Sequence, residues 1–512
     1  MTKIGLEIHC QLTKLESKLF CSCKADYRGF EPNANICPVC IGLPGSLPIL
    51  NQKAVEKAAM ISMALGCKVP QKIGFFRKNY FYPDLPKSFQ ITQYNAYGPT
   101  SIGYDGKIRI EDKEIRIQRI QLEEDPGRLV YEGSSEKTQV TLVDYNRAGT
   151  PLVEIVTEPD FETPKQVRLF LNLLADLVEN LGVSDPSLEG ALRVDGNISI
   201  DKGNRVEIKN VGSFRDIEKA LHFEITRQQS LAERNITIPS ETRHWDEARK
   251  ITVSARSKEE EQDYRYFPEA DIPSILIDKT VIERLGKNMP ESIISKKERY
   301  KKYGIPLQVA EVLSSDKFYS DLFERSLPCP VCGNGTLVRE YDEGDTHKRE
   351  FSCGHGGIVG VINELMNINE RVSKIAKETA NIITTDLKGF VDTNEQREQL
   401  KLTANHLSDL SYAILNNKIT RNAAKVALQE IIKTGKLLSE IISTLDLGHI
   451  DDESSLSQVI DDVFVEEQKA VSEAKNNPDT INYLVGKVMK KTKGKANPAL
   501  TLDLIKKRLD AQ

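Results

Sequence analysis

The first 290 residues contain short stretches in which apolar and polar side chains alternate. In IGLEIHCQL the apolar side chains fall at every second position from Ile4 to Cys10, with Glu7 and His9 between them. LRVDGNISI and RVEIKN repeat this pattern further along the chain. A period of two residues is typical of a strand with one buried and one polar face. We therefore expect a sheet whose polar face gathers charged side chains.

One helix in this part of the chain has well-marked ends. Thr163 precedes Pro164 and stands three residues before Gln166, which is the pattern of a capping box with a first-turn proline. Apolar residues then recur at helical spacing until Gly182, which ends the pattern. Strands mixed with occasional helices, without regular βαβ alternation, predict an α+β domain over residues 1–290.

After about residue 290 the sequence changes to segments rich in Lys, Glu and Leu, which favour helices. We expect an all-α domain over 291–401, with a Gly-, Cys- and His-rich insertion at about 327–357, and a helical tail over 402–512. Several domains also suit the length, because 512 residues exceed what one hydrophobic core usually serves.

Composition narrows the class of protein. Apolar residues make up 39% and charged residues 28% of the chain, which is typical of an ordinary globular protein. No apolar run reaches the length of a membrane helix, and the first residues lack the layout of a signal peptide, so we expect a cytoplasmic protein. The net charge of −5 argues against a chain covered with nucleic-acid-binding charge, but it allows a local basic patch.

Seven of the nine cysteines form two clusters, which in a reducing compartment favours metal binding over disulfides. In the first cluster, Cys21-Ser-Cys23 is followed after thirteen residues by Cys37-Pro-Val-Cys40. Two close thiol pairs at this separation predict a tetrahedral zinc site with four cysteine ligands.

The second cluster lies in the predicted insertion. Cys329-Pro-Val-Cys332 is followed after twenty residues by Cys353-Gly-His355, which resembles a zinc ribbon with one histidine ligand. His347 competes with His355 for this role, although its setting in DEGDTHKRE is typical of a solvated hairpin tip.

Carboxylates form the third constellation. Glu7 and His9 project from the same side of one strand, and QLEEDPG places Glu123 and Glu124 just before a turn. Glu154 stands in the apolar stretch TPLVEIV, where burial without a cation is costly. If these groups converge, they suit Mg²⁺, which takes oxygen ligands and bridges nucleotide phosphates. The alternative is that each one is a solvated charge or part of a structural salt bridge.

The stretch FFRKNYFYPDLPKSFQITQ combines cations with aromatic rings. Arg77, Lys78 and Lys87 could bind phosphates while the neighbouring rings stack on a base. The alternative is a loop at the edge of the core whose rings pack inward. DYRYFPEAD carries a similar mixture. Neither a P-loop nor a dinucleotide-binding glycine turn occurs, and no serine or cysteine elbow indicates a hydrolase nucleophile.

The C-terminal stretch YLVGKVMKKTKGKANP predicts a basic loop between two helices. Its functional interpretation is contact with a phosphate backbone, and the alternative is a solvated lysine-rich loop. The lysines concerned are Lys487, Lys490, Lys491, Lys493 and Lys495.

Nine segments, spread over nearly the whole chain, occur in the following order: GLEIHCQL, NANICPVCIGLPG, RKNYFYPDLPKSFQITQ, LEEDPGRL, DYNRAGTPLVEIVTEPD, ALRVDGNISI, VEIKNVGSF, DYRYFPEADIP and LVGKVMKKTKGKANP. Together they resemble successive motifs of the GatB family, one of the subunit types of the aspartyl/glutamyl-tRNA(Asn/Gln) amidotransferases. A related archaeal protein has a synthetase-like insertion that this chain lacks.

The resemblance implies a glutamine synthetase-like cradle, followed by an all-α domain and a helical, YqeY-like tail. It also implies a ligase reaction. ATP phosphorylates the side-chain carboxylate of glutamyl-tRNA(Gln) or aspartyl-tRNA(Asn), and ammonia then displaces the phosphate. The ammonia comes from glutamine through a partner amidase, GatA, and a small third protein, GatC, completes the heterotrimer.

Site residues follow from the same resemblance. It assigns catalysis and Mg²⁺ binding to Glu7, His9, Glu124 and Glu154, and tRNA binding to the tail lysines. Candidates for contacts with ATP and its phosphates are Lys78, Arg147, Asp195, Asn197 and Lys209. Two other classes remain open on the residues alone: a stand-alone small-molecule carboxylate-amine ligase and a zinc-containing RNA-binding scaffold.

Overall fold

The computed structural model divides the chain into two compact units, Met1–Ile293 and Ile294–Gln512. The residues that it describes are 2–95, 98, 100–131, 140–201, 203–256, 264–329, 332, 337–343, 346–354, 356–358, 370–391, 393–448, 453–474, 478–492, 495–496 and 498–510.

The first unit is built on an eight-stranded sheet in the order β13-β12-β11-β10-β1-β9-β6-β5. Smaller sheets, β14-β3-β4, β15-β2 and β7-β8, accompany it. The strands are β1 (Thr2–Gln11), β2 (Lys72–Ile73), β3 (Phe76–Asn79), β4 (Phe89–Thr92), β5 (Gly103–Ile110), β6 (Lys113–Glu124), β7 (Arg128–Tyr131), β8 (Thr141–Asp144), β9 (Pro151–Thr157), β10 (Leu192–Ile200), β11 (Val206–Lys209), β12 (Glu241–Asp246), β13 (Ile251–Arg256), β14 (Phe267–Pro268) and β15 (Ile275–Leu276).

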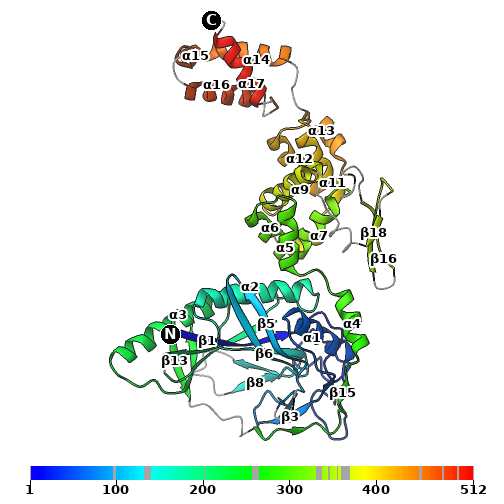
Figure 1. Cartoon of the computed structure of the whole chain (residues 1–512), viewed down its shortest axis with the longest axis vertical. Helices are drawn as coiled ribbons and strands as arrows, with labels where there is room; N and C mark the ends of the chain where they lie inside the picture. The colour runs from blue at the N-terminus through cyan, green and yellow to red at the C-terminus, as the bar shows by residue number, and fades with distance from the viewer. Residues whose placement is uncertain are drawn as a thin grey trace. The chain divides into compact units, whose positions relative to one another are not determined.

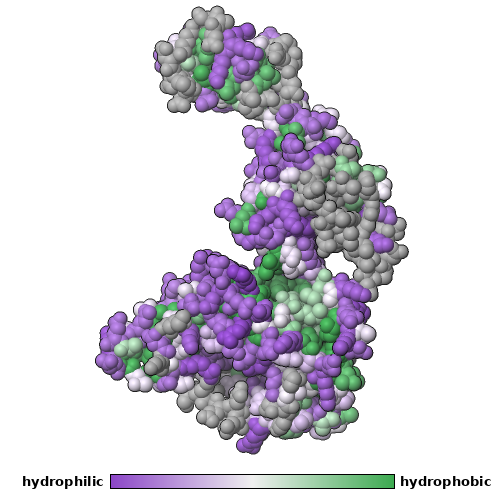
Figure 2. Space-filling view, in the orientation of Figure 1, coloured by the Kyte–Doolittle hydropathy of each residue, from purple (hydrophilic) through white to green (hydrophobic). Residues whose placement is uncertain are grey.

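The large sheet has one apolar and one polar face, as the alternating sequences predict. Leu6, Ile8 and Cys10 of β1 are buried in the main apolar core, whereas Glu7 and His9 between them are only half-buried. Helices cover the apolar face, and in Figure 1 two of them run along one side of the strands. The outward surface over these two, α2 and α3, is mainly hydrophilic (Figure 2). The helices of this unit are α1 (Gln52–Ala64), α2 (Pro164–Asn180), α3 (Phe214–Glu233) and α4 (Lys279–Asn288).

The predicted helix after Thr163 is confirmed as α2. The Thr163 hydroxyl accepts a hydrogen bond from the Gln166 amide, and the Gln166 side chain accepts one from the Thr163 amide. Gly182, just beyond the helix, adopts φ +63°, a left-handed conformation that suits glycine. Together with the strands, this helix gives the first 290 residues the mixed α and β structure that the sequence predicts.

The second unit is mainly helical, as expected from its composition. Its helices are α5 (Ile293–Lys302), α6 (Leu307–Ser315), α7 (Lys317–Ser326), α9 (Glu370–Asn381), the π-helix η3 (Ile382–Leu387), α10 (Asn394–Glu398), α11 (Ala404–Leu415), α12 (Arg421–Thr434), α13 (Leu438–Thr444), α14 (Glu453–Glu466), α15 (Gln468–Ala474), α16 (Pro478–Lys491) and α17 (Pro498–Asp510). No helix among the described residues is long and apolar enough to cross a membrane.

The described residues of this unit form two apolar cores. One joins buried side chains between Tyr300 and Ile441, and the other joins those between Leu456 and Leu509. The first core has members on both sides of the expected boundary at 401/402. The proposed domain boundaries themselves remain predictions.

A three-stranded ribbon, in the order β16-β17-β18, stands in the predicted insertion. Strands β16 and β17 are antiparallel, and Glu343 is paired with Thr346; residues 344 and 345, at the tip predicted from DEGDTHKRE, lie outside the described residues. The strands are β16 (Leu337–Glu343), β17 (Thr346–Phe351) and β18 (Gly356–Ile358).

Candidate active site

The polar face of the large sheet brings Glu7, His9 and Glu154 together. His9 of β1 is paired with Glu154 of β9, and Glu7 lies two residues before His9 on the same face. One ligand atom from each of the three side chains lies within 4.8 Å of the other two. Because residues directly opposite in an antiparallel pair have Cβ atoms about 4.5–5.5 Å apart, the register of the strands builds this cluster.

Glu123, rather than its neighbour Glu124, lies beside this group. His9 Nε2 is 3.8 Å from Glu123 Oε1. Successive side chains of a strand point to opposite faces, so Glu124 leaves β6 on the other side. There, Lys87 Nζ lies 2.6 Å from Glu124 Oε2, and the Ile91 amide donates to Oε1 at 2.8 Å. The structure therefore does not bring Glu124, which the resemblance assigned to Mg²⁺, to the other three residues.

The charges of this cluster are only partly balanced by its own side chains. Burial, together with the negative charges of Glu123 and Glu7, raises the pKa of Glu154 to about 8. Burial lowers the pKa of His9 to about 4, so its imidazole is neutral at neutral pH and can act as a ligand. Burial also acts to raise the pKa of Glu7, but His9 and nearby cations outweigh it and leave this pKa below its usual value. Crowded carboxylates of this kind favour a bound cation.

Lys78 of β3 faces the cluster from the small sheet β14-β3-β4. Burial acts to lower its pKa, but Tyr266, Glu123 and other groups around it outweigh this effect and raise the pKa. Its ammonium group lies 4.7 Å from the centre of the Tyr264 ring and 5.8 Å from that of Tyr80. Aromatic faces therefore hold the cation in place beside the carboxylates.

The two aromatic motifs predicted from the sequence come together at this point. The rings of Tyr80 and Tyr264, one from each motif, meet edge to face with their centroids 5.8 Å apart. Tyr94, directly after the first motif, stacks on Tyr266 with the centroids 4.0 Å apart. Of the three cations predicted for this stretch, only Lys78 faces the cluster, because Arg77 is bound to Glu269 at 2.6 and 2.7 Å and Lys87 is bound to Glu124. Phosphate contact by Arg77 or Lys87 would require breaking these pairs.

The polar face continues across β10 and β11. Lys209 Nζ lies 3.0 Å from Asp195 Oδ2 and 3.7 Å from Glu207 Oε1. Burial raises the pKa of Asp195 to about 6 in spite of this lysine. Asn197 Oδ1 is buried and accepts no hydrogen bond from any described residue. Three of the predicted cofactor contacts thus lie on one surface, and one of them has an unsatisfied acceptor.

A buried ion network supports the other side of the cluster. Asp125 lies 2.8 Å from Arg193 Nη2, and it accepts a hydrogen bond from Gln11 Nε2 at 2.6 Å. Arg147, a predicted phosphate contact, donates to the carbonyls of Pro126 and Gly127 at 2.9 and 2.6 Å. Its guanidinium group therefore braces the loop after β6 in this structure.

The comparisons with known proteins bear on this arrangement. Two family models match the sequence, the GatB/GatE catalytic domain over residues 2–283 and the GatB domain over 364–509. The GatB subunit of the aspartyl/glutamyl-tRNA(Asn/Gln) amidotransferase from Saccharolobus solfataricus is 42% identical to this chain over 512 residues, and the match covers 99% of both chains. A protein of the same name from Sulfolobus acidocaldarius is 44% identical, and the match covers 99% of this chain and 100% of the relative. The one from Thermotoga maritima is 40% identical, and the match covers 99% of both chains. The chain belongs to the GatB family.

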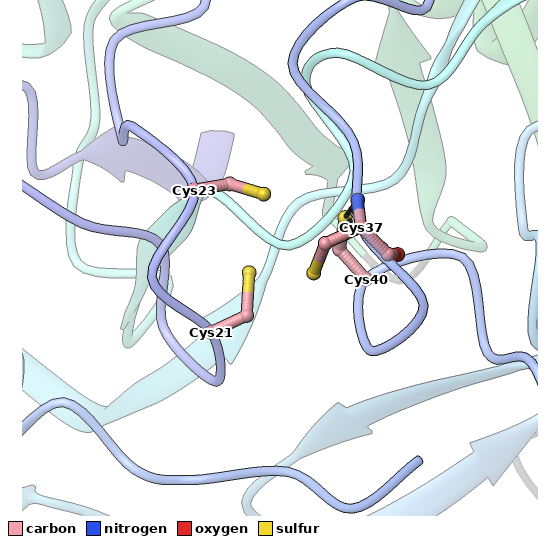
Figure 3. A group of neighbouring side chains, drawn as sticks. All are labelled: Cys21, Cys23, Cys37 and Cys40. Carbon is pink, nitrogen blue, oxygen red and sulfur yellow. Dashed lines mark hydrogen bonds between the residues drawn. The ribbon is translucent and has the colours of Figure 1, made fainter. Parts of the chain in front are cut away.

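The four cysteines of the first cluster lie in the part of the chain that matches the GatB/GatE catalytic domain. Cys21 and Cys23 come from one turn, and Cys37 and Cys40 from another turn that faces it (Figure 3). Their sulfur atoms all lie within 4.8 Å of one another. A hydrogen bond with Cys21 contributes most to lowering the pKa of Cys40, to about 4, and the charge of Lys18 contributes as well. The four thiols fit the donor set of a tetrahedral zinc site.

The second cysteine cluster lies between the two stretches that match the GatB models. Cys329, Cys332 and Cys353 converge, with all three sulfur atoms within 4.8 Å of one another. His355, which the sequence predicted as the fourth ligand, lies outside the described residues, and so does the side chain of His347.

The tail lysines belong to the segment that matches the GatB domain. Lys487 pairs with Glu467 at 2.5 Å, Lys491 pairs with Glu466 at 2.7 Å, and Lys495 pairs with Asp446. Lys490 is exposed and has no ion-pair partner among the described residues. Lys493 lies outside the described part of the chain.

The sequence predicted Glu123 just before a turn, but Glu123 was not among the predicted metal ligands. The alternation of buried and polar side chains along β6 is the signal that could have identified it. Ile120 and Leu122 are fully buried in the core, so Glu123 must point to the polar face and Glu124 must not. Glu207, which lies between Lys209 and Thr242, could be found in the same way from RVEIKN.

Proposed function

We propose that this GatB chain activates the side-chain carboxylate of glutamyl-tRNA(Gln), of aspartyl-tRNA(Asn), or of both, with ATP, and then catalyses its amidation. The observation that carries the proposal is the cluster of Glu7, His9, Glu123 and Glu154 on a polar sheet face, with Lys78 opposite. We further propose that the large sheet and the small sheet around it form a glutamine synthetase-like cradle. In the family relatives, the name amidotransferase describes the transfer of an amide nitrogen to the aminoacyl-tRNA.

We propose that Mg²⁺ binds between Glu7, His9 and Glu154, with Glu123 beside them. Two observations support this site. The ligand atoms of Glu7, His9 and Glu154 lie within 4.8 Å of one another, and burial together with the negative charges of Glu123 and Glu7 raises the pKa of Glu154. Mg²⁺ supplies charge neutralisation for the phosphates of ATP. A role for Glu124 as a direct ligand is not part of this proposal, because its carboxylate is held by Lys87 and the Ile91 amide.

The protein's own groups would act mainly by position and charge. A carboxylate oxygen of the substrate attacks the γ-phosphorus of ATP, the bond to the β,γ-bridging oxygen breaks, and ADP leaves. Lys78 is placed to stabilise charge on the transferring phosphoryl group, because it is held as a cation against the cluster. Ammonia then attacks the acyl carbon of the acyl phosphate, and inorganic phosphate departs with the bonding electrons.

We assign the remaining polar face to ATP. Asn197, with its unsatisfied Oδ1, offers an acceptor to the amino or hydroxyl groups of the nucleoside. Lys209 and Asp195 lie next to Asn197 and form an ion pair, so this surface carries both a positive and a negative group. Arg147 would act by holding the loop after β6 rather than by binding phosphate.

We propose a structural zinc ion for Cys21, Cys23, Cys37 and Cys40. The buried ammonium of Lys18 supports it, because Lys18 Nζ lies 3.7 Å from Cys40 Sγ and 2.8 Å from the Asn35 carbonyl oxygen. A buried cation is stable only beside negative charge, which a tetrathiolate zinc site carries.

We propose partners by the same family relation. The amidase GatA would supply ammonia, the small protein GatC would complete the heterotrimer, and misacylated tRNA would bind the tail lysines. A cytoplasmic location remains a prediction.

The deciding experiment measures ATP hydrolysis by the complex reconstituted with its amidase partner. We expect turnover that requires misacylated tRNA and that falls at least about 100-fold in Glu154→Gln, since a metal ligand should matter at least as much as the groups around it. The matched control is Glu114→Gln, because Glu114 is on β6 and its side chain is 57% exposed. Turnover that ignores tRNA, tested with both glutamyl- and aspartyl-tRNA, would rule out the proposed substrate.

A further inference from the structure

Three cysteines that lie outside both matched family models converge in the second unit. Cys329 and Cys332 follow helix α7, and Cys353 follows strand β17. Their sulfur atoms all lie within 4.8 Å of one another, although Cys353 is twenty-one positions beyond Cys332 in the sequence. In a tetrahedral site with Zn–S bonds of about 2.3 Å, the sulfur atoms are separated by roughly 3.8 Å. The three thiols are thus already close to the arrangement that a bound metal requires.

The ribbon that carries Cys353 has little apolar material to stabilise it. Among the described side chains of the ribbon itself, from Leu337 to Ile358, Phe351 is the buried apolar one. Val338, by contrast, is 67% exposed. Small sheets without a substantial core usually depend on a covalent or metal cross-link. The converging thiols lie at the base of the ribbon, where such a cross-link would act.

A second attachment joins the same ribbon to the helices. Arg349 of β17 lies 3.5 Å from Glu324 of α7. Glu324 in turn accepts hydrogen bonds from Arg299 at 2.6 Å and from the Tyr300 hydroxyl at 2.8 Å, both on α5. Glu324 is only five positions before Cys329, so the thiols and the ion pair hold neighbouring parts of one connection.

We propose that Cys329, Cys332 and Cys353 bind Zn²⁺, and that this ion fastens the three-stranded ribbon to helix α7. Three thiolates from the protein favour a soft, thiophilic divalent cation over Mg²⁺ or Ca²⁺. The site is separate from the tetrathiolate cluster, and its function is structural. The inference does not depend on the proposed amidotransferase reaction.

Metal stoichiometry tests the site directly. We would purify the full chain without chelators and measure zinc per chain by elemental analysis. We expect about two equivalents in the unmodified chain and about one in Cys353→Ser, because Cys353 is exposed and its replacement leaves packing intact. Cys23→Ser is the matched control, because it should lose the other equivalent and keep this one.

Two outcomes would overturn the metal site. One is a zinc content that is the same in Cys353→Ser as in the unmodified chain. The other is that the unmodified chain binds only one equivalent of zinc and that Cys23→Ser binds none. Loss of one equivalent of zinc in Cys353→Ser would support the site even if the ATPase assay gave a negative result. The zinc site and the proposed amidotransferase reaction are therefore tested independently.

Hydrogen exchange tests the fastening without any substitution. Zinc is removed from the full chain with a chelator and then added back, and exchange is followed in β16 and β17. We expect exchange there to become at least about tenfold faster after removal and to recover on adding zinc, while β10 stays protected. An unchanged rate in β16 and β17, with zinc demonstrably removed, would rule out a fastening role.

Discussion

At the scale of single residues, the side chains of Glu123 and Glu124 leave strand β6 on opposite faces. Glu123 lies beside His9, whereas Glu124 is bound by Lys87. We expect Glu123→Gln to lower tRNA-dependent ATP turnover by on the order of 100-fold or more with little change in stability. Glu124→Gln should instead destabilise the chain by about 3–5 kcal/mol, because it leaves the Lys87 ammonium buried without its partner.

Turnover and denaturant midpoints, measured on the same preparations, separate these effects. Raising Mg²⁺ should restore part of the activity of Glu123→Gln and none of that of Glu124→Gln. A Glu124→Gln chain of normal stability that loses activity would return the metal role to Glu124.

Lys18 is a fully buried lysine with no carboxylate partner among the described residues. If its counter-charge is the zinc-loaded cluster, Lys18→Met should weaken zinc binding by roughly 10–100-fold, the range for groups around a metal site. The measurement is the rate at which zinc from this cluster passes to a chromogenic chelator, in a Cys353→Ser background. Lys14→Met is the control, since its side chain is 51% exposed and pairs with Asp185. An unchanged rate in Lys18→Met would mean that the cluster carries no charge that Lys18 balances.

Much of the candidate site can be predicted from the sequence at the scale of single residues. The alternation around Glu7 and His9 placed both on one face, and the apolar neighbours of Glu154 indicated a buried carboxylate that needs a partner. The choice between Glu123 and Glu124 depended on the phase of the last residues of β6, because a register shift between Ile117 and Arg119 separates them from the alternation earlier in the strand. Asp125 and Arg193 are in contact although they stand 68 positions apart in the sequence, and no local pattern predicts such a contact.

At the scale of elements, helix α7 carries a buried acid surrounded by cations. Burial acts to raise the pKa of Glu324, but Arg299, Lys296 and Arg349 outweigh it and lower the pKa to about 2. Its pKa in the unfolded chain is about 4.5. A pKa that is lower in the folded state stabilises the fold above the unfolded value. The stability from Glu324 should therefore be complete above about pH 4.5 and be lost as the pH falls toward about 2, by on the order of 3 kcal/mol.

Pulse-labelled hydrogen exchange across a urea series, read on peptides of α5 and α7, follows this helical core by itself. Glu324→Gln should remove the pH dependence in that window and lower stability at neutral pH, because three buried or half-buried cations lose their partner. Glu298→Gln is the matched control on α5, since Glu298 is 58% exposed. If the unmodified chain keeps its midpoint from pH 5 to pH 3, Glu324 does not contribute in this way.

Elements with strong local signals were predicted well, and those held by distant contacts were not. The capping box and glycine stop defined α2, and period two defined β1, β10 and β11. Helix α3 was missed, although Ser213 caps it by accepting a hydrogen bond from the Asp216 amide. Its buried face includes Glu224 and Gln228, which are bound within an ion network on β12 and β13, so its hydrophobic stripe is interrupted.

At the scale of the whole molecule, charge is distributed unevenly. The chain as a whole carries −5, yet residues 481–512 hold seven lysines and one arginine against two aspartates. Lys487 pairs with Glu467, between α14 and α15, and Lys491 pairs with Glu466 at the end of α14; the two lysine side chains are 39% and 34% exposed. Exposed pairs of this kind contribute little to stability, so phosphates can replace the carboxylates at low cost.

Replacing Lys487, Lys490 and Lys491 together by Gln should therefore weaken tRNA binding and flatten its dependence on salt. Each lost phosphate contact lowers the slope of log K against log salt by roughly 0.7–0.9, so three contacts should lower it by about 2–3. The measurement is tRNA affinity of the complex across a salt series, with Lys297, Lys301 and Lys302 of α5 replaced by Gln as a control of equal charge. A slope that changes equally in both variants would indicate attraction to overall charge, whereas a change confined to the tail variant places the phosphate contacts on α16. Because the substitutions lie outside the first unit, Met1–Ile293, ATP turnover at saturating tRNA should stay the same. This separates binding of the tRNA from activation of its carboxylate.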